Sequence, residues 1–183
     1  VTEHLDLSRP FGAHSYEIYA KALNHAFLNH QRRFNRLPET SSTSHMSAVD
    51  AEGNMVALTY TLLNRFGSKV VLPSSGVLMN NAVSYFDPRP GYPTSIVGGK
   101  RINASNMCPM VCVRDDEAIF AVGASGANHI VPCTMQVAAF MLDYGMSLEE
   151  AFNTPRIDAG GRASIRVDPA AGEEVLATLG RSF

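Results

Sequence analysis

The order of the predicted elements indicates an α+β fold in which helices cover antiparallel sheet. Two hairpin patterns, each made of two extended runs around a short turn, lie in the middle of the 183-residue chain. A helix with almost no polar face follows the second hairpin. Strands joined by tight turns pair antiparallel, whereas parallel strands need a long crossover between them. The sequence therefore favours antiparallel sheet with helices packed on it over a parallel α/β array.

The N-terminal region is predicted to be one amphipathic helix followed by a linker. Apolar side chains recur at spacings of three and four, and we expect the helix to run from residue 16 to about residue 31. Residues 35–42 show no periodicity, contain a proline and end in a polar run, as linkers do. A boundary is therefore predicted near Thr43, which divides the chain into residues 1–42 and 43–183.

The first hairpin pattern predicts a particular pairing of side chains. Two extended runs flank a short loop that ends in glycine, and they cover residues 44–50 and 54–62. If Asp50 pairs with Asn54, Thr43 lies opposite Thr61 in the same ladder. Directly opposed side chains are roughly 5 Å apart, so the two hydroxyls would be neighbours. A bulge at Gly53 would shift this register by one residue.

The region after this hairpin is predicted to be long and irregular, and a second hairpin follows it. Residues 66–100 are rich in glycine, proline, asparagine and serine, and a compact domain tolerates such a segment where it shapes a site. Residues 110–114 and 118–122 have strand character and are joined by an acidic turn at residues 115–117. A glycine-rich turn then leads into the buried helix, which is expected at residues 128–144.

The remaining C-terminal elements are predicted to be short. Ser147 and Glu150 have the spacing of a capping box, which starts a short helix that ends before Pro155. A strand is expected at residues 163–167 and a helix at residues 173–179.

Composition and charge indicate an ordinary globular domain and disfavour several classes of partner. Hydrophobic residues make up 45% and charged residues 17% of the sequence, the net charge is -2 and the isoelectric point is near 6.3. Such a weak field does not favour nucleic acid or an anionic membrane as a partner. The three cysteines are an odd number without zinc-site spacing, so free thiols are expected, and neither a metal nor another cofactor is implied. The first residues lack a signal-peptide pattern, and the compartment stays open.

Two hydroxyl side chains are candidates for a nucleophile. Ser125 lies between a strand and a helix in Gly-Ala-Ser-Gly-Ala, which is close to the Gly-x-Ser-x-Gly elbow of serine hydrolases but departs from it at Ala127. That elbow needs a separate histidine, and the only one downstream is His129 in the same predicted helix. Thr43 would be activated if its bond to Ser42 were cut, because the freed α-amino group, with a pKa of about 8, is a base within the same residue. On pattern alone, a threonine in a hairpin is an ordinary strand residue.

Blocks of sequence from Thr43 to about Val167 match one known family in order. They begin with residues 43–61 and continue with Phe66-Gly67-Ser68, residues 75–81 with Phe86, Met107-Cys108-Pro109, Gly123-x-x-Gly126, and residues 143–145 through Thr154-Pro155-Arg156. In these blocks the chain resembles the small subunit of the γ-glutamyltransferase (γ-glutamyltranspeptidase) family, of the amino-terminal-nucleophile hydrolase superfamily.

The resemblance implies a role for each matched residue of the catalytic centre. Autocatalytic cleavage would expose Thr43, which would form an acyl-enzyme that water or an amine resolves. Thr61 matches the threonine that hydrogen-bonds the nucleophile, in agreement with the hairpin register. Gly126 and Ala127 match the paired glycines whose backbone N–H groups form the oxyanion hole. A loop that enters a helix can point such donors at a developing oxyanion.

Positions that would hold the head group of a glutamate substrate are altered. Leu63 stands where the family has an asparagine, and Ala82 stands where it has a glutamine. Tyr85 stands where the family has the carboxylate that would pair with the substrate amino group. Of the family's paired serines, Ser105 is kept and the second is Asn106, and both are candidates for substrate binding. Loss of a buried carboxylate partner for an ammonium is costly, so a free γ-glutamyl α-amino group is not expected to be recognised.

The resemblance also implies a fold, a function and a partner. The fold would be a four-layer αββα sandwich of stacked antiparallel sheets, of which this chain holds a part. Residues 1–42 would be the end of a large-subunit-like segment with a linker, and residues 43–183 the small-subunit-like catalytic region. The implied function is an autoprocessed amide hydrolase or acyltransferase that acts on a small-molecule or peptide amide. Its acyl donor would be a γ-glutamyl compound such as glutathione, or a related acyl amide as in the cephalosporin-acylase branch.

The rest of the large-subunit segment is the expected partner, and the family resemblance is also compatible with a homo-oligomer. The alternative is a non-catalytic relative that keeps the fold as a binding or interaction module, and the altered pocket positions favour it.

Overall fold

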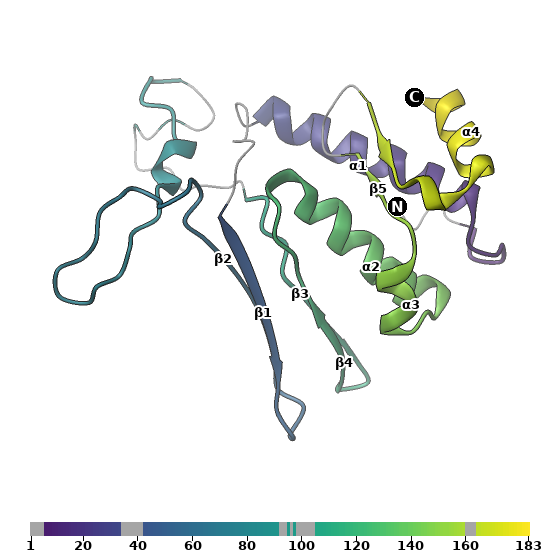
Figure 1. Cartoon of the computed structure of the whole chain (residues 1–183), viewed down its shortest axis with the longest axis horizontal. Helices are drawn as coiled ribbons and strands as arrows, with labels where there is room; N and C mark the ends of the chain where they lie inside the picture. Colours follow the sequence, from purple (N-terminus) through teal and green to yellow (C-terminus); the bar gives the residue numbers. More distant parts are fainter. Residues whose placement is uncertain (1–5, 34–41, 92–94, 96, 98–104, 160–163) are drawn as a thin grey trace. The chain divides into compact units, whose positions relative to one another are not determined.

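The computed structural model describes residues 6–33, 42–91, 95, 97, 105–159 and 164–183, which form a mixed helix and sheet fold (Figure 1). The chain divides into two compact units, residues 30–130 and residues 1–29 together with 131–183. The paired strands of the described residues are antiparallel in each of the three sheets, as the order of elements predicted.

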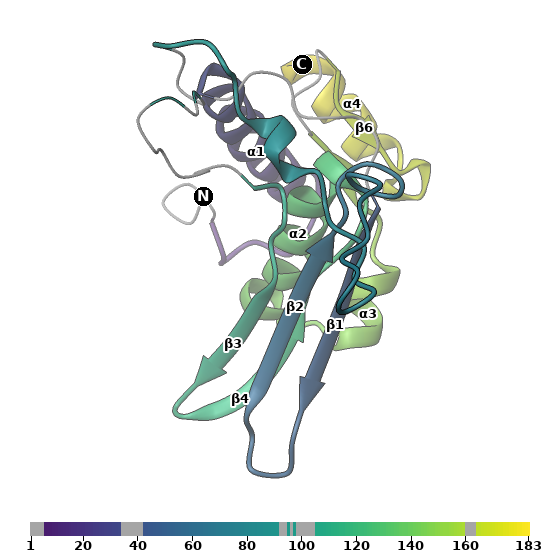
Figure 2. The same cartoon turned by 90° about the vertical axis from the view of Figure 1, so that its left-hand side faces the viewer.

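The first unit is built around two β-hairpins. They are β1 (Thr43–Val49) with β2 (Met55–Thr61), and β3 (Met110–Arg114) with β4 (Glu117–Val122). In Figures 1 and 2 the two hairpins lie side by side, and residues of β2 approach both β3 and β4. In the first hairpin Thr43 is opposite Thr61 and Val49 is opposite Met55, so the predicted register is confirmed without a shift at Gly53.

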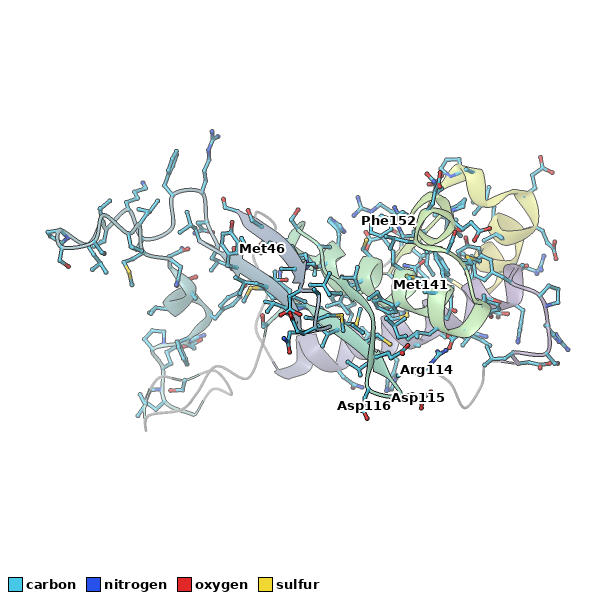
Figure 3. All side chains as sticks on the ribbon, turned by 90° about the horizontal axis from the view of Figure 1, so that it is seen from below. Met46, Arg114, Asp115, Asp116, Met141 and Phe152 are labelled. Carbon is cyan, nitrogen blue, oxygen red and sulfur yellow. The ribbon has the colours of Figure 1, made fainter. Side chains whose placement is uncertain are left out.

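The second hairpin has a tighter turn than predicted and one irregularity. Asp115 and Asp116 both have positive φ, at 53° and 62°, which defines a two-residue turn that matches the twist of the flanking strands. Figure 3 shows both aspartates at the tip of this hairpin. Because the turn has only two residues, β4 begins at Glu117, one residue earlier than expected. The register changes between Cys112 and Val113, which leaves Ile119 of β4 as the extra residue of a β-bulge.

The segment between the hairpins is mostly irregular, as predicted. It contains a short 3₁₀ helix, η2 (Ala82–Tyr85), and an isolated bridge between Val71 and Leu78. The residues of this segment at 92–94, 96 and 98–104, and the linker residues expected at 35–41, lie outside the described part of the chain.

The second unit is mainly helical. Its elements are α1 (Ala13–Arg33, to residue 29 in this unit), α2 (Ile130–Tyr144, from residue 131), α3 (Leu148–Asn153), β5 (Ile157–Asp158), β6 (Arg166–Val167), the 3₁₀ turn η4 (Pro169–Ala171) and α4 (Glu173–Ser182). The predicted capping box is present, because Ser147 accepts from the Glu150 backbone while the Glu150 carboxylate accepts from Ser147. The predicted helices are confirmed, with slightly longer ends at α1 and α4 and a start at Ile130 instead of residue 128 for α2.

The core of the second unit combines aromatic packing with buried hydrogen bonds. The rings of Phe11 and Phe140 meet edge to face, with centroids 4.9 Å apart, and Tyr19 is fully buried. The Gln136 side chain, also fully buried, donates to Ile157 O at 2.7 Å and accepts from Ile157 N at 2.9 Å. This amide therefore fastens β5, which also pairs with β6, to α2.

Candidate active site

The two threonines predicted to be neighbours form a hydrogen-bonded pair. Thr43 is the first residue of β1 and Thr61 the last of β2, and the Thr43 hydroxyl donates to Thr61 Oγ1 at 3.2 Å. Both side chains are half-buried. Thr61 Oγ1 also accepts from the Leu63 backbone N–H at 2.9 Å. The backbone thus fixes the Thr61 oxygen, which in turn orients the Thr43 hydroxyl.

The peptide bond before Thr43 is part of the same hydrogen-bonded ladder. Ser42 N–H donates to Leu63 O at 3.0 Å, and Leu62 N–H donates to Ser42 O at 3.4 Å. The carbonyl that precedes Thr43 is therefore held in extended geometry beside the hydroxyl of the following residue.

Leu63 has an unusual backbone for a leucine. Its φ is 69°, in the left-handed region, and its side chain is 1% exposed. That region costs an ordinary L-residue about 1–2 kcal/mol, whereas asparagine and glycine enter it more readily. The position thus has a backbone conformation suited to the asparagine that the resemblance implies, while the buried leucine offers no polar group.

The loop that carries the expected oxyanion donors turns sharply into a helix. Gly126 has φ 125° and Ala127 has φ 53°, and His129 N–H donates to Gly126 O at 3.0 Å. Ala127, 5% exposed, begins the 3₁₀ turn η3 (Ala127–His129) that runs into α2. Ser125, the rival nucleophile, is exposed in this loop. A glycine at position 127 would adopt this positive φ freely, whereas Ala127 adopts it with backbone strain.

The segment that carries the altered positions Ala82 and Tyr85 is hydrogen-bonded, through Asn81, to the residues that follow β2. Asn64 N–H donates to Asn81 Oδ1 at 2.9 Å, and Asn81 N–H donates to Leu62 O at 3.2 Å. The next residues are Ala82 and, at the end of η2, Tyr85. Burial raises the pKa of the half-buried Tyr85 hydroxyl above its ordinary value, so this side chain is a neutral phenol where the resemblance expects a carboxylate.

The two expected substrate-binding residues before β3 differ in exposure. Ser105 is exposed and its hydroxyl accepts from Met107 N–H at 3.0 Å, whereas Asn106 is 7% exposed. Their contribution to substrate binding stays a prediction.

Sequence reasoning missed His45, which lies on the same face of β1 as Thr43. Its Nδ1 is 2.8 Å from the Thr59 hydroxyl and its Nε2 is 2.9 Å from the Ser47 hydroxyl. The signal was available, because residues two apart on a strand share a face and the predicted register places Thr59 opposite His45.

Neither a metal-binding cluster nor a membrane-spanning helix is present in the part of the chain that the structure describes. No group of three or more histidine, cysteine, aspartate or glutamate residues there could hold a metal ion. Among those same residues, no helix has the length and apolar character needed to cross a membrane. The cysteines, Cys108, Cys112 and Cys133, are free thiols.

Comparison with known proteins identifies the family. The γ-glutamyltranspeptidase family matches residues 11–182, and the chain therefore belongs to this family. The "Acylase ACY 1 proenzyme" of Pseudomonas sp. (strain V22) is 38% identical over 141 residues, which cover 77% of this chain and 25% of that protein. The "Glutathione hydrolase proenzyme" of Escherichia coli (strain K12) is 35% identical over 127 residues, 64% of this chain and 22% of that protein. The chain thus spans about a quarter of the length of these relatives.

Solved structures of the family have a similar fold. The γ-glutamyltranspeptidase from Pseudomonas nitroreducens complexed with L-DON gives a TM-score of 0.58 at 29% identity, with 76% of this chain and 79% of that chain covered. The T380A mutant of the Helicobacter pylori enzyme gives a TM-score of 0.60 at 26% identity, with coverages of 76% and 81%.

Proposed function

We propose that this chain carries the catalytic threonine of an autoprocessed amide hydrolase or acyltransferase of the γ-glutamyltransferase type. The observation that carries the proposal is the hydrogen bond between the Thr43 and Thr61 hydroxyls. Ser42, the residue before Thr43, is held by backbone hydrogen bonds to Leu62 and Leu63. Two relatives in the same family are named proenzymes, which suits a protein that is cut before it acts.

Self-cleavage would use the groups already in place around Thr43. Thr43 Oγ1 attacks the carbonyl carbon of Ser42, and the hydroxyl proton passes to the Thr43 nitrogen as the C–N bond breaks. The acyl group thus moves from nitrogen to oxygen. Leu62 N–H, which donates to Ser42 O, stabilises the charge that develops there. Water then hydrolyses the ester, which leaves a carboxylate on Ser42 and both a free hydroxyl and a free α-amino group on Thr43.

The freed α-amino group would then serve as the base for turnover. It takes the hydroxyl proton as Thr43 Oγ1 attacks the carbonyl carbon of the donor amide. The N–H groups of Gly126 and Ala127 stabilise the oxyanion, and one such donor is worth about 3 kcal/mol. The C–N bond breaks as the leaving amine receives the proton, and an ester on Thr43 remains. Water completes a hydrolysis, and a second amine completes a transfer.

The altered pocket favours a donor without an α-ammonium group. Leu63 is buried and apolar, and Tyr85 is neutral, so neither offers a charge to a γ-glutamyl head group. Of the activities in the two relatives' names, acylase fits these residues better than glutathione hydrolase.

A pair of anilides that differ only in the α-amino group tests this substrate class. We expect glutaryl p-nitroanilide to exceed γ-glutamyl p-nitroanilide in kcat/KM by about tenfold or more, since an unpaired ammonium must be desolvated. A strict requirement for the α-amino group would contradict the proposed donor. Absence of turnover with both anilides, together with an uncut chain, would instead favour the non-catalytic relative that the altered pocket positions also suit.

The complete protein is proposed to form a four-layer αββα sandwich. Residues 1–42 would end the large-subunit-like segment, and residues 43–183 would be the catalytic region. The outer face of the first hairpin supports this, because Met46 (52% exposed, labelled in Figure 3), Val56 (56%) and Leu58 (46%) form an apolar surface that a second layer would cover. The rest of the large-subunit segment is the proposed partner, since this chain is only a quarter of its relatives' length.

A further inference from the structure

The His45 imidazole is held by hydrogen bonds at both nitrogens. Nδ1 pairs with the Thr59 hydroxyl across the hairpin, and Nε2 pairs with the Ser47 hydroxyl along β1. A hydroxyl can donate or accept, so either neutral tautomer of the ring is satisfied. To turn the ring away, both bonds must break.

The held ring lies directly against the backbone of Gly123. A Cβ atom built on Gly123 would be 2.2 Å from both Nδ1 and Cε1 of His45, far inside van der Waals contact. The φ of Gly123 is not among the positive values of the chain, so its backbone conformation is open to other residues. Glycine is therefore required at this position for space and not for its conformational freedom.

This contact joins the strand of the nucleophile to the loop of the oxyanion donors. His45 is two residues after Thr43 on the same face of β1. Gly123 directly follows β4 and opens the loop that continues to Gly126 and Ala127. The position of the loop relative to Thr43 is thus set where the imidazole meets Gly123.

We propose that His45 is a positioning residue, which seats the loop of Gly126 and Ala127 at the correct distance from Thr43. The inference rests on the proposed function and adds a residue to it. Both ring nitrogens of His45 are engaged by Thr59 and Ser47, so its proposed role is to act through the loop. Because oxyanion donors act mainly on the transition state, a displaced loop lowers kcat and leaves KM nearly unchanged.

A double-mutant cycle at His45 and Gly123 in the full-length protein tests the proposal. His45→Ala and Gly123→Ala should each lower kcat for the preferred anilide by about tenfold or more, with KM changed less than about twofold. The informative variant is the double mutant, because removal of the ring makes room for the new methyl group. Its kcat should equal that of His45→Ala within about twofold, far above the product of the two single losses.

Gly180→Ala is the matched control. Gly180 lies in α4 with open space around its Cβ position and should accept alanine without loss. Unfolding midpoints of all variants separate a kinetic effect from a loss of fold.

The outcomes are distinguishable. An inactive, uncut wild type defeats the proposed function. An active wild type with additive losses in the double mutant, or an unchanged kcat in His45→Ala, overturns the positioning role while the proposed function stands.

Discussion

Ala127→Gly is predicted to cost almost no stability, although alanine-to-glycine changes at buried positions are normally damaging. Ala127 has φ 53° and is 5% exposed. Its left-handed conformation costs about 1–2 kcal/mol, which glycine recovers. Against this, the change loses one buried methyl group, about 0.8 kcal/mol, and adds about 0.4–1 kcal/mol of freedom to the unfolded chain. These contributions nearly cancel.

Ala138→Gly provides the comparison within the same protein. Ala138 is buried in the interior of α2, where glycine loses a similar methyl contact. A glycine in a helix interior costs about 1 kcal/mol more than alanine, so the total loss should be about 2 kcal/mol. Urea unfolding followed by circular dichroism, in a Thr43→Ala background so that every variant is one chain, measures both changes. Equal losses at the two positions would refute the strain assigned to Ala127.

Three further predictions concern hydrogen bonds of the described residues. Thr61→Val should slow self-cleavage by about fivefold, because it removes one hydroxyl hydrogen bond of about 1 kcal/mol. Thr61→Ser keeps the hydroxyl and should cleave at nearly the wild-type rate. Cleavage of Thr61→Val at the wild-type rate would contradict the pairing. A hydrogen bond from the Asn54 side-chain amide, with smaller contributions from nearby backbone N–H groups, lowers the pKa of Asp50 below its ordinary value of 3.8. Asp50→Ala should therefore reduce stability at neutral pH, and its deficit should shrink as the pH falls from 3.8 through the lowered pKa, as tested by thermal melts across that range. Gln136→Leu should lower the unfolding free energy by about 2–4 kcal/mol, because it leaves the N–H and C=O of Ile157 without their side-chain partner; a urea midpoint near wild type would rule this out.

Local chemistry made much of this structure predictable. The register of the first hairpin followed from one assumption, that Asp50 pairs with Asn54 around a short loop, because a turn fixes every later pair in the ladder. That register alone placed Thr43 against Thr61. The capping box of Ser147 and Glu150 was equally local and is present.

Features that depend on distant residues were missed. β5 has two residues and no strand pattern of its own, and it is held by the side chain of Gln136, which lies 21 positions earlier. The need for glycine at position 123 was invisible, because the ring that excludes a side chain comes from His45 on another hairpin. Neither contact can be predicted from the residues next to β5 or Gly123 in the sequence.

The central claim, that Thr43 is a nucleophile released by self-cleavage, is tested most directly by intact-mass spectrometry. The full-length protein would be measured after purification and again after long incubation, beside its Thr43→Ala and Thr43→Ser variants. The account predicts two fragments for the wild type, one of which begins at Thr43, slower cleavage at the same bond in Thr43→Ser, and a single uncut mass in Thr43→Ala. A single uncut mass for the wild type that persists on incubation, or cleavage that continues in Thr43→Ala, would contradict it.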